Sequence, residues 1–173
     1  MSHSYHRYQL YPFWDTEYKT LDYITETFND PESLQLWTSQ GYANRFTGAM
    51  CDMRNAQPTW NQRFLDIYHE QGWKDVGTSY YRMGTGTILP THEDLYVKYK
   101  SVFGLEGREN TIRRAIVFLE DWQSGHYAEI MGRPLVDWKA GTVLEWSYDT
   151  PHMAANLGLT PRYTLQITGH VDD

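Results

Sequence analysis

The sequence predicts a mainly β protein with α-helices, organised as one jelly-roll domain with an N-terminal helical layer. Two observations support this prediction. Short apolar runs separated by Gly, Pro and Asp fill residues 76–173, whereas helical periodicity is confined to residues 1–75. The chain has 173 residues, of which 40% are hydrophobic and 16% aromatic. A chain of this size and composition can bury its own core as a single domain.

Charge and cysteine content exclude several classes of protein. The chain has 22 acidic and 15 basic side chains and a net charge of -7, which repels phosphate backbones and anionic lipids. We therefore expect neither a nucleic acid nor a membrane as a partner. Cys51 is the only cysteine, so no intrachain disulfide forms. No signal-like segment or long apolar run is present, and we expect a cytoplasmic protein.

Two segments have the pattern of amphipathic helices. In "NDPESLQLWTSQGY", Asp30 is a candidate N-cap and Pro31 suits the first helical position. In "PTWNQRFLDIYHEQGW", Gly72 suits a left-handed position after the helix end. The apolar positions that share a face are Leu34 and Trp37 in the first segment, and Trp60, Phe64, Ile67 and Tyr68 in the second.

The rest of the chain reads as β-strands in an antiparallel sandwich or barrel. With helices covering one of its sheets, the simplest arrangement is a double-stranded β-helix, the jelly-roll fold of cupin-like proteins. Residues 1–75 then form a helical and loop layer, and residues 76–173 the jelly-roll core. The predicted strands lie within 76–83, 87–97, 112–121, 126–132, 141–147 and 162–171.

The segment "THEDLY" contains a possible metal site. On a strand, His92 and Asp94 point to the same face, while Glu93 points to the other. Two imidazoles and one carboxylate on one face of an octahedron bind Fe(II) and leave the other positions free for a cosubstrate and dioxygen. The alternative is a solvated strand end, and the metal interpretation requires a second histidine.

The best candidate for that histidine is His152, 60 residues after His92. It follows a strand that begins after Gly141, and Pro151 places it in a turn at the far end of that strand. Strands distant in sequence meet at the mouth of a jelly roll, so this turn can bring His152 to the pair.

A polar strand face ten residues later provides a second feature. If this face is exposed, it is an ordinary solvated surface. If it faces the interior, Arg162 is a buried cation that needs an anion, and its planar guanidinium matches a carboxylate. 2-Oxoglutarate suits both the metal ligands and Arg162. Its keto-acid group chelates the metal, and its far carboxylate pairs with Arg162, beside the Thr164 hydroxyl. The polar face comprises Arg162, Thr164 and Gln166, and the apolar face Tyr163, Leu165 and Ile167.

These motifs, in this order, resemble the Fe(II)- and 2-oxoglutarate-dependent dioxygenases. "PHMAANLGLTPRYTL" resembles the distal-histidine segment of aspartyl/asparaginyl β-hydroxylase-like members, and "YYRMGTGTILPTHED" the strand before the first histidine in prolyl-hydroxylase-like members. The resemblance covers residues 80–169. It implies that His92, Asp94 and His152 are the catalytic metal ligands and that Arg162 and Thr164 bind the cosubstrate.

The resemblance also implies a reaction. With Fe(II) bound, 2-oxoglutarate and dioxygen act as cosubstrates, 2-oxoglutarate is decarboxylated to succinate, and a substrate C–H bond is hydroxylated. Halogenating relatives have a small residue in place of the carboxylate ligand, so Asp94 favours hydroxylation.

Three further residues are weaker candidates. Arg114 resembles an arginine that helps to hold an acid in β-hydroxylase-like members, although a surface position is an equal alternative and Arg113 competes for the role. Tyr81, or its neighbour Tyr80, is a candidate phenol donor to the cosubstrate, with core packing as the alternative. Asn156 suits the turn after His152.

Other aromatic residues and histidines are assigned more general positions. We expect Tyr96 on the ligand side as a pocket wall and His126 in a hairpin loop. The tryptophans 122, 138 and 146 fill the core or line the rim of the pocket.

Three functions are consistent with the sequence. The first is hydroxylation of an amino-acid side chain, free or within a peptide. The second is the same chemistry on another small metabolite. The third is a non-catalytic jelly-roll binding module, which the complete set of candidate ligands argues against.

Overall fold

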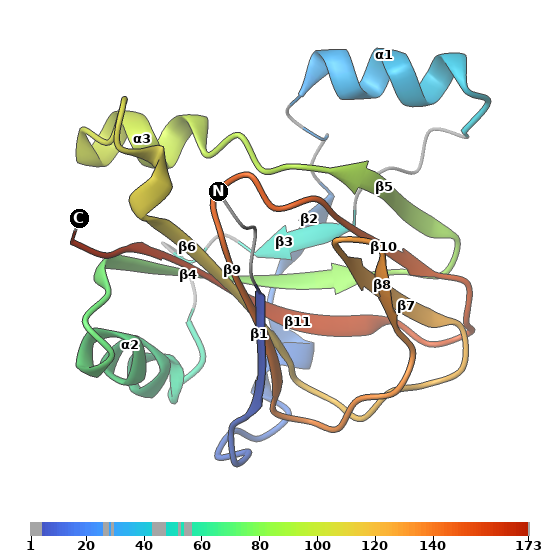
Figure 1. The fold of residues 1–173 in the computed structure, drawn as a ribbon. Coiled ribbons are helices and arrows are strands. Elements are labelled where there is room, and N and C mark those ends of the chain that lie inside the picture. Colours follow the sequence, from blue (N-terminus) through green and yellow to red (C-terminus); the bar gives the residue numbers. More distant parts are fainter. Residues whose placement is uncertain are drawn as a thin grey trace.

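The computed structural model describes residues 5–25, 28, 30–42, 48–51, 53 and 57–172. Within these residues, the chain forms two antiparallel sheets and three α-helices (Figure 1). The larger sheet contains, in spatial order, β1 (Tyr5–Gln9), β9 (Thr142–Ser147), β6 (Ile112–Phe118), β11 (Arg162–His170), β4 (Lys74–Met83), β3 (Ala49–Cys51) and β2 (Tyr23–Thr25). The smaller sheet contains β5 (Thr87–His92), β10 (His152–Asn156), β7 (His126–Ile130) and β8 (Arg133–Leu135).

From β4 onward the chain passes back and forth between the sheets. β4, β6, β9 and β11 lie in the seven-stranded sheet, and β5, β7, β8 and β10 in the four-stranded sheet. One apolar cluster contains Phe118 and Leu144 from the larger sheet and Ala128 and Ile130 from the smaller sheet, so the inner faces of the two sheets pack against each other.

The two predicted N-terminal helices form but occupy different places. α1 (Pro31–Ser39) begins after Asp30, whose side chain accepts a hydrogen bond from the Glu32 amide. α2 (Asn61–Glu70) packs its buried Phe64 and Tyr68 against the outer face of the seven-stranded sheet. α1 lies apart from α2, near the end of β5 (Figure 1). The helices therefore do not form one common layer.

Several local predictions differ from the structure. Residues 1–75 were expected to form helices and loops, but β1, β2 and β3 extend the larger sheet. The strand expected over 87–97 ends at His92, and α3 (Val97–Phe103) follows. His152 begins β10 rather than lying in a turn, and His126 begins β7 and is buried, not in a loop. Two short 3-10 helices, Glu17–Thr20 and Glu109–Thr111, complete the described elements.

No helix among the described residues is both long enough and apolar enough to cross a membrane.

Asn156 fixes the connection between β10 and β11, in agreement with its predicted role in a turn. Its buried amide donates to the carbonyls of Met83 and Thr160, each at 2.8 Å, and its Oδ1 accepts from the Gly158 amide at 3.0 Å. Replacing it leaves buried backbone groups unpaired, which is costly.

We predict that Asn156→Ala lowers the free energy of unfolding by about 2–4 kcal/mol, because it removes several buried hydrogen bonds. Urea denaturation measures the change. Leu159→Ala is the control, since Leu159 in the same connection is 93% exposed. Equal stability of the two variants would contradict the structural role given to Asn156.

Candidate metal centre and adjoining cavity

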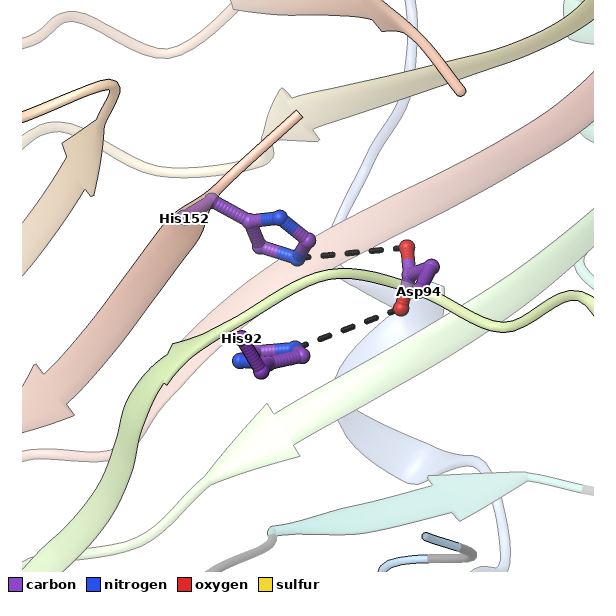
Figure 2. Close-up of side chains that lie close together, drawn as sticks. All are labelled: His92, Asp94 and His152. Carbon is purple, nitrogen blue, oxygen red and sulfur yellow. Dashed lines mark ion pairs between the residues drawn. The ribbon is translucent and has the colours of Figure 1, made fainter. Parts of the chain in front are cut away.

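Strand pairing brings the two histidines together. His92 ends β5, His152 begins β10, and their Cα atoms are partners in the antiparallel ladder. Asp94 lies two residues beyond β5, and its carboxylate faces both imidazoles (Figure 2). Its Oδ1 is 4.0 Å from His92 Nε2 and its Oδ2 is 3.9 Å from His152 Nε2. One ligand atom from each residue lies within 4.8 Å of the others.

Both imidazoles are oriented for metal binding. His92 Nδ1 is 2.8 Å from the Pro90 carbonyl oxygen, and His152 Nδ1 is 2.9 Å from that of Thr150. A carbonyl only accepts, so in each neutral ring the proton sits on Nδ1 and Nε2 carries the free lone pair. Backbone carbonyls commonly hold metal-binding histidines in this way.

The electrostatic environment favours the protonation states that bind a metal. Burial and the neighbouring His152 lower the pKa of His92 to about 4, so its ring is neutral at pH 7. Burial alone would raise the pKa of Asp94, but the Arg114 guanidinium and the two histidines outweigh this effect and hold the pKa at about 2. A neutral imidazole and an ionised carboxylate are what Fe(II) requires.

Arg114 holds the carboxylate of Asp94 from the opposite sheet. Its Nη2 lies 3.2 Å from Asp94 Oδ2, its Nη1 donates to Gln166 Oε1 at 3.2 Å, and its guanidinium lies 5.1 Å from the centre of the Tyr96 ring. The Arg114 side chain is only 14% exposed, so the surface alternative is wrong. Its contact in the structure is with the candidate metal ligand, and a role in cosubstrate binding stays a prediction.

Arg162 is a buried cation without an anionic partner among the residues that the structure describes. Its Nη1 donates to the Tyr127 carbonyl at 2.7 Å, and its buried Nε has no hydrogen-bond partner. Burial lowers its pKa to about 10, but the guanidinium remains charged at neutral pH. Buried charges in proteins are normally paired, so this residue has an unmet requirement for an anion.

Thr164 and Tyr81 lie beside each other on neighbouring strands. They are partners in the ladder between β11 and β4, and both are buried. The Tyr81 hydroxyl accepts a hydrogen bond from the Gly48 amide at 2.6 Å. Its proton is therefore available for donation to another acceptor.

A cavity of about 560 Å³ joins these groups between the two sheets. The polar and apolar faces of β11 are arranged as predicted: Arg162, Thr164 and Gln166 line the cavity, whereas Leu165 and Ile167 pack into the core beneath α2. All seven predicted site residues line the cavity: Tyr81, His92, Asp94, Arg114, His152, Arg162 and Thr164.

Sequence reasoning placed Tyr96 incorrectly and missed three contacts. Tyr96 is not a cavity wall; it is buried and packs against Arg114. Phe28 and Trp37 contact the His92 ring at centroid distances of 5.1 and 6.0 Å, and Trp146 contacts the His152 ring at 4.8 Å. Trp146 was recognisable only as a pocket or core residue and Trp37 only as part of an apolar helix face, because aromatic packing leaves no specific spacing in sequence.

The donor set fits a resident Fe(II) ion. Two imidazoles with free Nε2 atoms and one ionised carboxylate converge from a strand end, a loop and a second strand. This is the two-histidine, one-carboxylate ligand set of non-heme iron oxygenases. Within the described residues, these three are also the only cluster of potential metal ligands with this proximity.

Comparison with known proteins supports the fold. No protein-family model matches the chain, and no curated protein matches it in sequence. A prolyl-4-hydroxylase from Pseudomonas putida aligns with 99% of this chain and 95% of its own, with 14% identity and a TM-score of 0.57. The non-heme monooxygenase ThoJ, in a nickel complex, aligns with 80% of this chain and 64% of its own, with 18% identity and a TM-score of 0.51. The chain thus shares the fold of these two proteins.

We predict that Asp94→Ala and His152→Ala each weaken the binding of Fe(II), or of Co(II) as a probe, by at least about 100-fold, since each removes one of three ligands. Titration calorimetry without oxygen measures the affinity. His69→Ala is the control, because His69 is exposed on α2. Unchanged affinity in either ligand variant would exclude this metal site.

A separate prediction concerns Arg114. Arg114→Gln should weaken metal binding by about 10- to 100-fold, as expected for loss of a partner that orients a ligand. If Arg114 acts only on the cosubstrate, the variant will bind metal normally and lose only affinity for 2-oxoglutarate. The two titrations, carried out on the same preparation, separate these roles.

Proposed function

We propose that the chain is an Fe(II)- and 2-oxoglutarate-dependent oxygenase that hydroxylates its substrate. The observation that carries this proposal is the presence of Arg162 in the same cavity as the three candidate metal ligands. A metal triad alone suits many reactions. A buried guanidinium that lacks an anion is matched by a carboxylate, and 2-oxoglutarate supplies one together with a metal-chelating keto acid.

The order of the strands supports a double-stranded β-helix core for this enzyme. β4 to β11 supply four strands to each sheet, in the orders β9-β6-β11-β4 and β5-β10-β7-β8. This is the organisation of an eight-stranded jelly roll, whose open end commonly carries a ligand site.

Each site residue has a defined role in the proposed reaction. His92, Asp94 and His152 hold the metal, and Arg114 keeps the Asp94 carboxylate ionised and oriented. Arg162 pairs with the far carboxylate of 2-oxoglutarate, with the Thr164 and Tyr81 hydroxyls as additional donors. Bound Fe(II) supplies the centre at which dioxygen is reduced. One oxygen atom enters the substrate C–H bond and the other enters succinate, as 2-oxoglutarate loses carbon dioxide.

The substrate class follows from the resemblance. Both subfamilies that the motifs resemble hydroxylate amino-acid side chains, and the P. putida neighbour is named as a prolyl-4-hydroxylase. We therefore propose an amino-acid side chain, free or within a peptide, as the first candidate. Another small metabolite is the second candidate, and the apolar character of one end of the cavity favours it.

We predict that anaerobic addition of Fe(II) and 2-oxoglutarate produces a weak visible charge-transfer band. We also predict that Arg162→Ala weakens the binding of 2-oxoglutarate by about 2–3 kcal/mol, or about 30- to 150-fold, because it removes a charge-assisted pair. Titration of the band measures the affinity. Arg133→Ala, at an exposed position on β8, is the control.

The outcomes separate the proposed functions. Absence of the band, together with no binding of 2-oxoglutarate by calorimetry, would contradict the proposed oxygenase function. The non-catalytic binding module would then be the remaining hypothesis. A band that Arg162→Ala leaves unchanged would show that the cosubstrate carboxylate binds elsewhere.

A further inference from the structure

The cavity has two ends on either side of the metal ligands. β11 lines its floor with Arg162, Thr164, Gln166 and Thr168 in succession. Thr168 lies opposite Arg114 in the ladder, and Arg114 contacts Asp94. The metal ligands are therefore close to the Thr168 end, and Arg162 lies at the other. Cosubstrate that reaches from the metal to Arg162 leaves the Thr168 end for the substrate.

α3 forms a wall of this substrate end. Lys98, Tyr99, Val102 and Phe103 line the cavity from one side of the helix, and the Tyr99 hydroxyl donates to the Asp75 carbonyl at 3.0 Å, which ties α3 to β4. No residue of α3 is fully buried, and Val102 and Phe103 are 63% and 40% exposed. The helix thus presents an apolar surface that the described protein does not cover.

The charges at the same end are unbalanced. Asp94 is paired with Arg114, so it is not available to a substrate cation. Glu129 touches the cavity but lies on the opposite face of β7 from Ala128 and Ile130, and it accepts a hydrogen bond from the Tyr127 hydroxyl. Lys98 has no carboxylate within ion-pairing distance among the described residues.

We propose that the substrate is a small acid with an apolar body, whose carboxylate pairs with Lys98 and whose apolar part lies along Val102 and Phe103 toward the metal ligands. This inference rests on the proposed function, because it assigns the Arg162 end to 2-oxoglutarate, and it favours the second substrate candidate, a small metabolite, over a free amino acid. Three basic side chains line the cavity: Lys98, Arg114 and Arg162. Arg114 is paired with Asp94, and Arg162 is assigned to a carboxylate of 2-oxoglutarate, so Lys98 is the cation left for an anionic group of the substrate.

The same charges disfavour a free zwitterionic amino acid. Its ammonium group would enter a region that holds the cations Lys98 and Arg114, and like charges repel. The cavity volume of about 560 Å³ lies within the range of small-molecule sites. A small apolar acid therefore fits better than an amino acid of equal size.

The experiment compares ligands of similar shape that differ mainly in charge. The probes are hexanoate, octanoate and 3-phenylpropionate, the amide of each acid, and L-phenylalanine, which differs from 3-phenylpropionate by its ammonium group. Each is added anaerobically to the protein with Fe(II) and 2-oxoglutarate, and binding is followed as a shift of the charge-transfer band. Succinate formation is then measured in air. We expect at least one acid to shift the band and stimulate succinate formation more strongly than its amide or phenylalanine.

Variants of the helix test the assigned contacts. Lys98→Ala should weaken binding of the acid by about 3- to 5-fold, the size expected for a solvent-exposed ion pair, and leave the amide unaffected. Lys98→Glu should weaken the acid further by repulsion. Lys139→Ala is the matched control, since Lys139 is an exposed lysine paired with Asp121 on the surface. Both Lys98 variants should keep the band of the Fe(II) and 2-oxoglutarate complex.

Each outcome bears on one of the two proposals. Absence of the band in the unmodified protein would contradict the proposed function itself. Three results with a normal band would overturn the substrate assignment alone. No acid shifts the band, phenylalanine shifts it more strongly than 3-phenylpropionate, or the acids shift it equally in the unmodified protein and in the Lys98 variants.

Discussion

The antiparallel pairing of β5 with β10 is the interaction on which the site depends. It makes His92 and His152 direct partners across the four-stranded sheet, and the register shifts immediately after this pair, between His152 and Ala154. Two ligands are thereby positioned by backbone hydrogen bonds rather than by loops. Asp94 lies beyond the strand end, and Arg114 from the facing sheet holds it. The candidate metal site therefore depends on the assembly of both sheets.

Buried charge distinguishes the two arginines of the cavity. Arg114 recovers part of the cost of burial through the Asp94 carboxylate and the Tyr96 ring. Arg162 has the Tyr127 carbonyl and the Phe118 ring, 6.0 Å from its guanidinium, but no carboxylate among the described residues, and burial lowers its pKa to about 10 without neutralising it at pH 7. A fold that keeps such a cation charged and incompletely paired is less stable than one that pairs it. This loss of stability is consistent with a site for an anionic ligand, because a bound anion would pair with Arg162 and restore the stability.

Features encoded by local periodicity were predictable from the sequence. The Asp30 cap, the apolar face of α2 and the alternation along β11 follow from side-chain spacing alone. His92 and Asp94 do lie together, but Asp94 follows the end of β5, so the strand alternation that predicted this pair does not extend to it. α3 was not predictable in the same way, because "VKYK" alternates apolar and polar residues as a strand does. β8 has only three residues, one of them proline, and β10 pairs with β5 on one side and β7 on the other. Such segments are determined by tertiary pairing, which local pattern does not encode.

Two described residues of the N-terminal region pack beside the candidate metal ligands, although this region has almost no recognisable motif. Phe28 and Trp37 pack edge-on against the His92 ring, and Trp37 is 3% exposed. Aromatic side chains thus occupy space beside His92, while Trp146 packs against His152. The Arg162 end is assigned to the cosubstrate. The partly exposed side chains of α3 line the other end of the cavity, and under our proposal Val102, Phe103 and Lys98 on this helix select the substrate.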